Sequence, residues 1–419
     1  MANQLDPAEQ QVFAVEVVRQ LREAGFDAVW AGGCVRDRIL GLAPKDFDVA
    51  TSATPDQVRT VFSRRKTLAL GVSFGVITVL GPKRAGQIEV ATFRRDIGAS
   101  DGRHPDQVAF TGPEEDARRR DFTINGLFYD PLEDRVIDYV GGRDDLASGV
   151  VRAIGDAKLR FAEDKLRMLR AVRFAATFGF ALDEATLAAI EQMADQVSVV
   201  SAERIAQELR RMLLLARRVE AVDLLDRSRL FAVLFPNIAA RRAEGGAEKW
   251  SATRIALGAL DGPSFPVALA ALFLGWLDGG EVQQVCRGLR LSTDEINQTA
   301  WLVQYAPLVD EAHRAPWPLV QRVLCSPGAG ELVALAEARA KAGLAGMEGV
   351  NFCREKLALP IDQWNPPPLV TGDDLLARGV PEGKIYRVVL DKVRDAQLLG
   401  QVSTRDDALA LVDRLASCD

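Results

Sequence analysis

The stretch GGCVRDRILGLAPKDFDVATSATPDQV, residues 32–58, contains the features that decide the fold of this 419-residue chain. It follows four apolar residues, 28–31, that have the composition of a short strand. Two glycines allow a tight turn, and the apolar spacing after them predicts a helix that Gly41 ends. A second strand at residues 46–50 and a helix that begins near Pro55 continue the alternation. This stretch therefore predicts a mixed α/β head.

Two carboxylates, Asp46 and Asp48, lie two residues apart on the second expected strand. Such residues project from the same face, while Phe47 between them points into the core. Two negative charges this close repel each other unless a cation lies between them, and Mg²⁺ favours carboxylate and phosphate oxygens. Most isolated Asp-x-Asp pairs are solvated strand edges, so the surrounding residues decide the interpretation.

The glycine turn just upstream supplies that context. Gly32 and Gly33 let the backbone come close to a triphosphate, and the following helix start and Arg36 supply positive charge. A Gly-Gly turn alone indicates only turn geometry. Together with Asp46 and Asp48 it predicts a nucleotide site in which the two aspartates bind divalent metal.

The chain after this stretch changes character twice. Residues 76–80 and 88–93 are rich in β-formers and predict strands, and the polar, Gly- and Pro-containing residues 94–116 predict a mobile loop. Helical periodicity begins at about Leu159 and continues to the end, first over residues 159–178. We therefore expect an α+β chain, with the following division: a catalytic head at 1–150, a helical neck at 151–235, and a helical body and tail at 236–419.

Composition excludes several classes of protein. No apolar run approaches the roughly 20 residues of a membrane span, and the first residues lack a signal-peptide pattern, so a cytoplasmic location is expected. Five scattered cysteines without a C-x-x-C spacing argue against disulfides and zinc. The two histidines provide no His-Asp pair for a phosphohydrolase domain. With a net charge of −6, RNA binding would depend on local basic patches.

Four segments resemble the family of class II tRNA nucleotidyltransferases (CCA-adding enzymes) and bacterial poly(A) polymerases, within the polymerase-β-like superfamily. They are the stretch at 32–58, RRDFTING at 119–126, YVGGRDDL at 139–146 and EDKLRMLRAVRF at 163–174. The resemblance covers roughly residues 29–180 with high specificity. It implies a polymerase-β-like nucleotidyltransferase head followed by an all-α neck, body and tail.

The resemblance also implies an activity: template-independent transfer of CMP or AMP from CTP or ATP to the 3′ end of tRNA, with release of pyrophosphate and with Mg²⁺ as cofactor. Poly(A) synthesis and addition of only the terminal A are alternatives. A non-catalytic RNA-binding module is an alternative of another class. The expected partners are tRNA, ATP and CTP. No membrane association is expected, and the protein is expected to be a monomer or a homodimer.

For Asp164 and Arg167 the resemblance implies reading of the nucleobase, and chemistry agrees. Both lie within one turn of an expected helix and can face the same base. Cytosine and adenine each present an amine beside an unprotonated ring nitrogen. A carboxylate can accept a hydrogen bond from the amine, and a guanidinium can donate one to the ring nitrogen. Guanine and uracil place a carbonyl where Asp164 needs a donor. Taken without the other motifs, the pair would be an ordinary intrahelical ion pair.

Further arginines are assigned by the resemblance to the triphosphate: Arg120, Arg170 and Arg173. Residues spaced by three drift around a helix, so Arg173 can instead brace the head against the neck. A third carboxylate usually completes a two-metal site, and the sequence leaves open whether it is Glu89 or Asp121, with better motif support for Asp121.

The remaining expectations concern RNA and selectivity. Residues 94–116 are expected to decide which nucleotides are added, and Gly98-Ala99-Ser100 stands where an aromatic residue is common in C-C-A-adding relatives. RNA contacts are expected from basic neck residues and a tail helix start. These are Arg204, Arg210, Arg211, Arg217, Arg218 and Gly383-Lys384.

Overall fold

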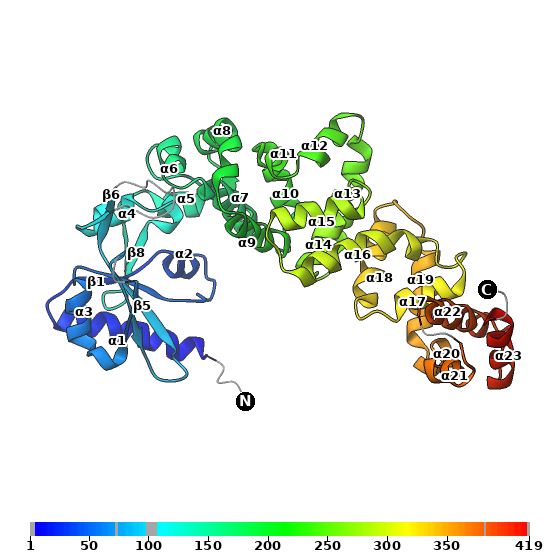
Figure 1. The fold of residues 1–419 in the computed structure, drawn as a ribbon. Coiled ribbons are helices and arrows are strands. Elements are labelled where there is room, and N and C mark those ends of the chain that lie inside the picture. Colours follow the sequence, from blue (N-terminus) through cyan, green and yellow to red (C-terminus); the bar gives the residue numbers. More distant parts are fainter. Residues whose placement is uncertain (1–4, 72–73, 98–106, 381–382, 417–419) are drawn as a thin grey trace. The chain divides into compact units, whose positions relative to one another are not determined.

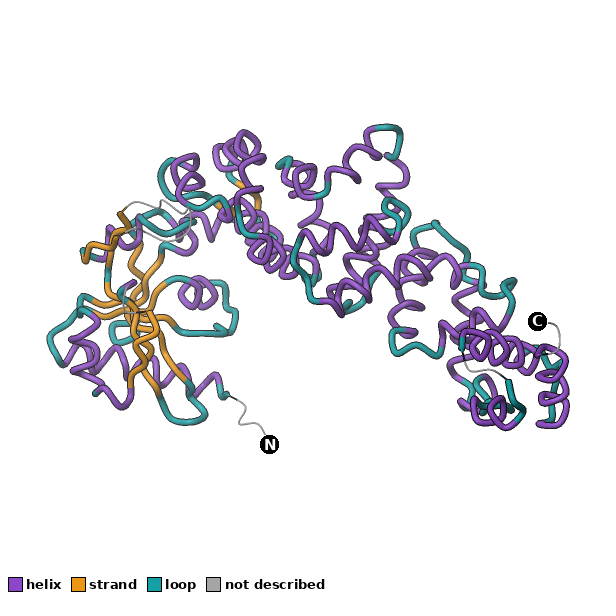
Figure 2. The backbone as a smooth tube through the Cα atoms, in the orientation of Figure 1, coloured by secondary structure: helices purple, strands orange, loops and turns teal. Residues whose placement is uncertain are grey.

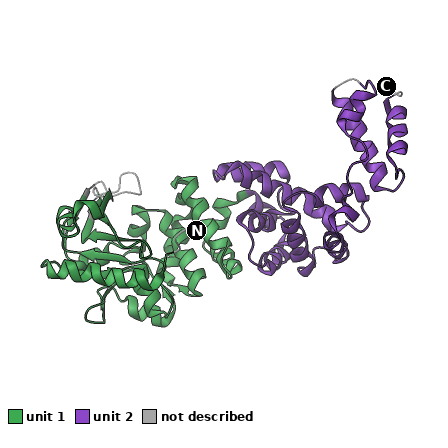
Figure 3. Cartoon of the chain, turned by 90° about the horizontal axis from the view of Figure 1, so that it is seen from below, with its two compact units in different colours: residues 1–236 green, residues 237–419 purple. Residues whose placement is uncertain are grey.

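The computed structural model describes residues 5–71, 74–97, 107–380 and 383–416. It divides into two compact units, Met1–Pro236 and Asn237–Asp419, which are coloured green and purple in Figure 3. The three-domain division expected from the sequence stays a prediction.

A seven-stranded sheet forms the centre of the first unit (Figure 1). Its strands are β1 (Ala28–Ala31), β2 (Asp48–Thr51), β3 (Thr67–Gly71), β4 (Val76–Leu80), β5 (Gln87–Thr92), β8 (Leu127–Asp130) and β9 (Arg135–Asp138), in the order β3-β4-β5-β2-β1-β8-β9. β2 and β5 pair in parallel, and the other neighbours among these described strands are antiparallel.

Helices cover the sheet because their apolar stripes need burial. The head contains α1 (Pro7–Glu23), α2 (Gly33–Ile39), α3 (Pro55–Phe62), α4 (Pro113–Arg118) and α5 (Gly142–Ser148). Asp6 caps α1, whose Val17, Val18 and Leu21 are fully buried. Trp30 of β1 donates from Nε1 to the Ala14 carbonyl at 3.3 Å, so its indole nitrogen is satisfied within the core.

Two expectations for the head need correction. The strand predicted at residues 46–50 begins at Asp48, although Phe47 is buried as predicted, with 3% of its surface exposed. Residues 94–116 are not one loop: β6 (Arg94–Ile97) pairs with β7 (Gln107–Phe110), and α4 follows. Backbone pairing overrides the polar composition there. Residues 98–106, with Gly98-Ala99-Ser100, lie outside the described residues.

The neck elements complete the first unit. They are β10 (Val150–Val151), α6 (Ala157–Glu163), α7 (Leu166–Phe178), β11 (Ala181–Leu182), α8 (Glu184–Met193), η4 (Ala194–Val199), α9 (Ala202–Leu213), α10 (Arg218–Arg227) and α11 (Leu230–Leu234). The single helix predicted at residues 159–178 is wrong, because Asp164 is extended with φ −149° and ψ 106°. Its Oδ1 accepts from the Leu166 amide at 3.0 Å and so starts α7.

The second unit is helical in its described residues, as Figure 2 shows in purple. Its helices are α13 (Ala247–Ala259), α14 (Phe265–Phe273), α15 (Gly279–Gly288), α16 (Thr293–Asp310), α17 (Trp317–Leu324), α18 (Ala329–Lys341), α19 (Glu348–Ala358), α20 (Ile361–Trp364), α21 (Gly372–Ala377), α22 (Lys384–Leu398) and α23 (Arg405–Ala416), and α12 (Pro236–Ala243) spans the boundary. The last three pack through Leu375, Val389, Val393 and Val412. No helix in the described part is both long enough and apolar enough to cross a bilayer.

The buried ring between the two aspartates yields a stability prediction. Phe47 contacts Trp30 edge to face, with ring centroids 4.8 Å apart. We expect Phe47→Ala to lower the free energy of unfolding by about 3 to 5 kcal/mol in urea denaturation of the full chain. Leu42→Ala, at a position 49% exposed, should change it by less than about 0.5 kcal/mol. Similar effects of the two substitutions would contradict the core assignment of Phe47.

Candidate active site

The glycine turn has a conformation that requires glycine. Gly32 has φ +74° and precedes α2, and its amide donates to the Leu127 carbonyl at 3.1 Å. A Cβ added there would lie 2.9 Å from Nη1 of Arg120. The backbone conformation therefore favours glycine, and a larger residue would also require the Arg120 side chain to shift.

Three carboxylates line one pocket of about 670 Å³: those of Asp46, Asp48 and Glu89. The helix that follows the glycine turn comes near it, because Sγ of Cys34 lies 4.0 Å from the Asp48 carbonyl oxygen. The parallel pairing of β2 with β5 sets Asp48 directly opposite Glu89. Side chains at paired positions of neighbouring strands lie on the same face of the sheet. The structure thus brings Glu89, one of the two candidates for a third carboxylate, beside Asp48.

The electrostatics of the pocket favour a bound cation. Loss of hydration raises the pKa of Asp48 to about 6, and the charges of Glu89 and Asp46 add to the shift, against an opposing effect of Arg120. A divalent cation would relieve this repulsion, and carboxylate oxygens suit a hard cation such as Mg²⁺. In the described residues, no three histidine, cysteine, aspartate or glutamate side chains are arranged so that they could hold a metal ion by themselves.

Asp121, the other candidate, belongs to a different cluster. Its Oδ2 accepts from Nε and Nη2 of Arg170 at 2.9 and 2.7 Å, and its Oδ1 accepts from Nδ2 of Asn125 at 2.9 Å. Burial would raise the pKa of Asp121, but the Arg170 charge and the Asn125 hydrogen bond outweigh it and hold the pKa below its usual value. The sequence preference for Asp121 over Glu89 as the third carboxylate is therefore not supported by the geometry.

Arg36, expected at the triphosphate, lies at a joint between the head and α7. Its Nη1 donates to Oδ1 of Asn125 at 2.6 Å, and its guanidinium lies over the rings of Phe174 and Phe178 at 5.2 and 4.7 Å. Only 8% of the residue is exposed. Asn125 thus connects Arg36 to Asp121. Sequence analysis did not single out Asn125, because an asparagine side chain carries no charge, although the residue lies within the RRDFTING motif.

Arg120 is the predicted phosphate-binding residue whose charge reaches the carboxylates. Its Nη2 donates to Oδ2 of Asp116 at 2.9 Å, and its Nη1 donates to the Asn125 carbonyl at 3.4 Å. The same charge opposes the rise in the pKa of Asp48. Arg120 therefore lies between the glycine turn and the acidic pocket.

The expected base-reading residues are held by different partners. Asp164 accepts from Nη1 and Nη2 of Arg204 at 3.2 and 2.7 Å. Arg167 donates from Nη1 to Oε2 of Glu163 at 2.6 Å and to the Arg160 carbonyl at 3.0 Å. The Arg167 amide donates to the Asp164 carbonyl at 3.1 Å, whereas in the described residues the two side chains are paired with Arg204 and Glu163 and not with each other. Arg204, expected to contact RNA, instead holds Asp164.

The remaining neck arginines differ in what they hold. Arg170 is bound to Asp121, and Arg173 donates from Nε to Oε2 of buried Glu208 at 2.5 Å, which joins α7 to α9. Arg173 therefore braces neck helices and not the head. Arg211 contacts the same Glu208 at 3.4 Å while its side chain remains 59% exposed.

Comparison with known proteins adds independent findings. Residues 28–152 match the model described as the poly(A) polymerase head domain, and residues 179–241 match "Probable RNA and SrmB- binding site of polymerase A". Poly(A) polymerase I of Escherichia coli O157:H7 is 41% identical over 248 residues, 56% of this chain and 52% of that protein. The CCA-adding enzyme of Geobacillus kaustophilus is 41% identical over 229 residues, 54% and 55%.

In its head and neck segments the chain is similar to CCA-adding enzymes and bacterial poly(A) polymerases. It spans about half the length of the curated relatives it matches. A crystal structure of the Bacillus stearothermophilus CCA-adding enzyme in complex with CTP matches 96% of this chain and 97% of that one, with TM-score 0.72 and 29% identity. The Thermotoga maritima CCA-adding enzyme, with TM-score 0.65 and 23% identity over 97% and 95% of the chains, shares the fold.

The Asn125 amide makes a testable contribution to stability. Asn125→Asp keeps the acceptor for Arg36 but removes the donor to Asp121 and sets a second carboxylate against it. We expect the free energy of unfolding to fall by about 2 kcal/mol or more in urea denaturation.

Asn365→Asp is the matched control. Oδ1 of Asn365 accepts from Gln321 and from Arg394, each at 2.7 Å. An aspartate there keeps both contacts, so the free energy should change by less than about 0.5 kcal/mol. An equal loss at both positions would show that the amide donor of Asn125 contributes nothing specific.

Proposed function

We propose that this chain transfers CMP and AMP from CTP and ATP to the 3′ end of tRNA and releases pyrophosphate. The observation that carries the proposal is the pocket that Asp46, Asp48 and Glu89 line together. Similarity over nearly the whole chain to a CCA-adding enzyme in complex with CTP supports it. A role for the chain as a non-catalytic RNA-binding module leaves this gathering of negative charge without a physical reason.

Mg²⁺ is the cofactor we propose, held by Asp46 and Asp48 with Glu89 as the third carboxylate. When bound, Mg²⁺ would lower the pKa of the attacking 3′ hydroxyl and neutralise negative charge on the α-phosphate. The glycine turn leaves room for the triphosphate, and Arg120 contributes positive charge next to it.

Selection of the base falls to Asp164 and Arg167 in this proposal. Oδ2 of Asp164 accepts one hydrogen bond, from Arg204, and a carboxylate oxygen has a second lone pair for the amine of cytosine or adenine. Among the described residues, Nε and Nη2 of Arg167 have no hydrogen-bond acceptor, so they can donate to the adjacent ring nitrogen. The other two bases lack this pattern.

Poly(A) synthesis is the second candidate, because poly(A) polymerase I sequences match at 40 to 41% identity. The loop that we expect to decide between the activities includes residues outside the described part. An assay separates the two: pure protein is incubated with CTP, ATP or both, and with tRNAs that lack their last three, two or one nucleotides. Addition that stops after C-C-A supports our proposal, whereas long A tails would overturn it. A cytoplasmic location and a monomeric or dimeric state stay predictions.

The carboxylate assignment predicts a specific set of losses. Asp48→Asn and Glu89→Gln should each lower the transfer rate by at least about a hundredfold, because each removes charge that holds the metal. Glu133→Gln, which changes an exposed carboxylate on the same unit, should leave the rate within about twofold. Single-turnover incorporation measures the rate. A Glu89→Gln enzyme as active as the Glu133→Gln enzyme would remove Glu89 from the site.

Base reading predicts a change in selectivity. Asp164→Asn introduces an amide that can donate to the carbonyl of guanine or uracil, so the preference for ATP over GTP should fall by about tenfold or more. Arg204→Ala frees the Asp164 carboxylate to turn and should act in the same direction. Competition between labelled triphosphates at fixed tRNA gives the ratio. If both variants lose incorporation of all four nucleotides equally, these residues have only a structural role.

A further inference from the structure

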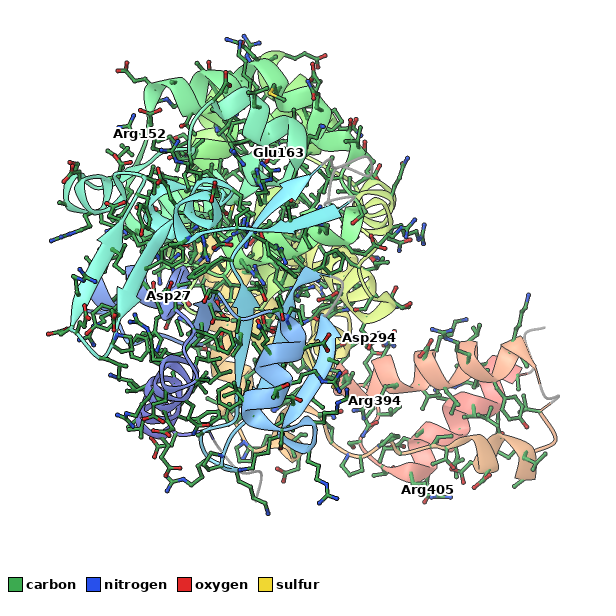
Figure 4. The ribbon with its side chains drawn as sticks, turned by 90° about the vertical axis from the view of Figure 1, so that its left-hand side faces the viewer. Asp27, Arg152, Glu163, Asp294, Arg394 and Arg405 are labelled. Atoms are coloured by element: carbon green, nitrogen blue, oxygen red, sulfur yellow. The ribbon has the colours of Figure 1, made fainter. Side chains whose placement is uncertain are left out.

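A second cavity, of about 860 Å³, opens in the first unit and shares no lining residue with the acidic pocket. Residues from α4, from the turn between β9 and α5, from the segment between β10 and α6, and from the start of α8 form its walls. Figure 4 labels one of them, Arg152, at the outer edge of the upper part of the view. Nothing in the nucleotide transfer described above uses this cavity.

The charge on the cavity wall is positive. Four basic side chains line it: Arg118, Arg152, Lys158 and Arg160. Its two carboxylates are already occupied. Asp156 accepts from the backbone amides of Lys158 and Leu159 at 2.8 and 3.2 Å, and Asp183 accepts from the Thr186 amide at 3.1 Å and pairs with Arg152. Three of the basic side chains also have acidic partners outside the wall: Arg118 pairs with Glu114 at 2.6 Å, Arg160 with Glu163 at 3.0 Å and Arg152 with Asp145 at 3.1 Å. Among the described residues the charge of Lys158 is not balanced in this way, and it favours an anion.

Two exposed side chains on the wall add the means of recognition. The ammonium of Lys158 has no acidic partner among the described residues, and an exposed lysine at a helix start can turn toward a phosphate. Tyr139 is 39% exposed, and its ring rests edge to face on Phe128, with centroids 6.4 Å apart. A supported aromatic ring next to basic side chains is the combination that binds single nucleotide units of RNA.

We propose that this cavity binds a nucleotide unit, with its base against Tyr139 and its phosphate on Lys158 and Arg118. The unit can belong to an RNA strand or be a free nucleotide, since both present the same base and phosphate. A volume of about 860 Å³ is ample for one such unit. Arg152 and Arg160 are anchored, to Asp183 and to the Ile154 carbonyl respectively, and so shape the wall.

The test measures binding and is independent of transfer activity. Tyr139→Ala and Lys158→Glu are compared with Arg135→Glu, a charge reversal at an exposed residue outside the cavity. Fluorescence anisotropy follows a labelled single-stranded RNA of mixed sequence, and equilibrium dialysis counts ATP molecules bound per chain. Circular dichroism confirms that each variant is folded.

The expected results are specific. If an RNA strand is the source, Lys158→Glu weakens RNA binding about tenfold for any sequence and lowers the salt slope by about 1. Tyr139→Ala then weakens it roughly tenfold through lost stacking. If a free nucleotide is the source, wild type binds two ATP molecules and both variants bind one. The proposal is overturned if both variants match Arg135→Glu in RNA affinity and in the number of ATP molecules bound.

Discussion

The pairing of β2 with β5 is the constraint on which the candidate site depends. In a sheet whose other described neighbours are antiparallel, this parallel pair sets Asp48 opposite Glu89, and Asp46 lies two residues before the strand begins. The backbone holds these charges together, so their repulsion cannot relax by separation of the strands. This repulsion contributes to the raised pKa of Asp48. Phe47, next to Asp48, packs against Trp30 and so anchors the start of the strand in the core.

A second set of contacts joins the sheet to the neck. Arg36, Asn125, Asp121 and Arg170 form a continuous chain of hydrogen bonds from α2 to α7. Asn125 is the member that must both accept and donate, which only an amide of this length does here. Arg36 and Arg170, which the sequence suggested as ligands of the substrate, therefore form hydrogen bonds within the protein.

Local features were predictable from the sequence, and partnerships across the fold were not. The glycine turn, the buried Phe47 and the family were all accessible because their signals lie within short segments. The position of Glu89 opposite Asp48 depends on strand register, which no local pattern encodes. The neck helix was misjudged for the opposite reason: uninterrupted helical periodicity concealed the side-chain cap that Asp164 makes for α7. Arg204 appeared to be a surface residue because its partner lies forty positions away.

For the base reading that we propose for Asp164 and Arg167, the break between α6 and α7 has a consequence for attempts to exchange selectivity between relatives. Asp164 is anchored by α9 through Arg204, whereas Arg167 is anchored by α6 through Glu163. The short motif that contains both residues therefore lacks Arg204, the partner that orients Asp164. A graft of residues 163–167 into another scaffold would transfer the chemical groups without their orientation. The smallest transferable unit runs from α6 to α9.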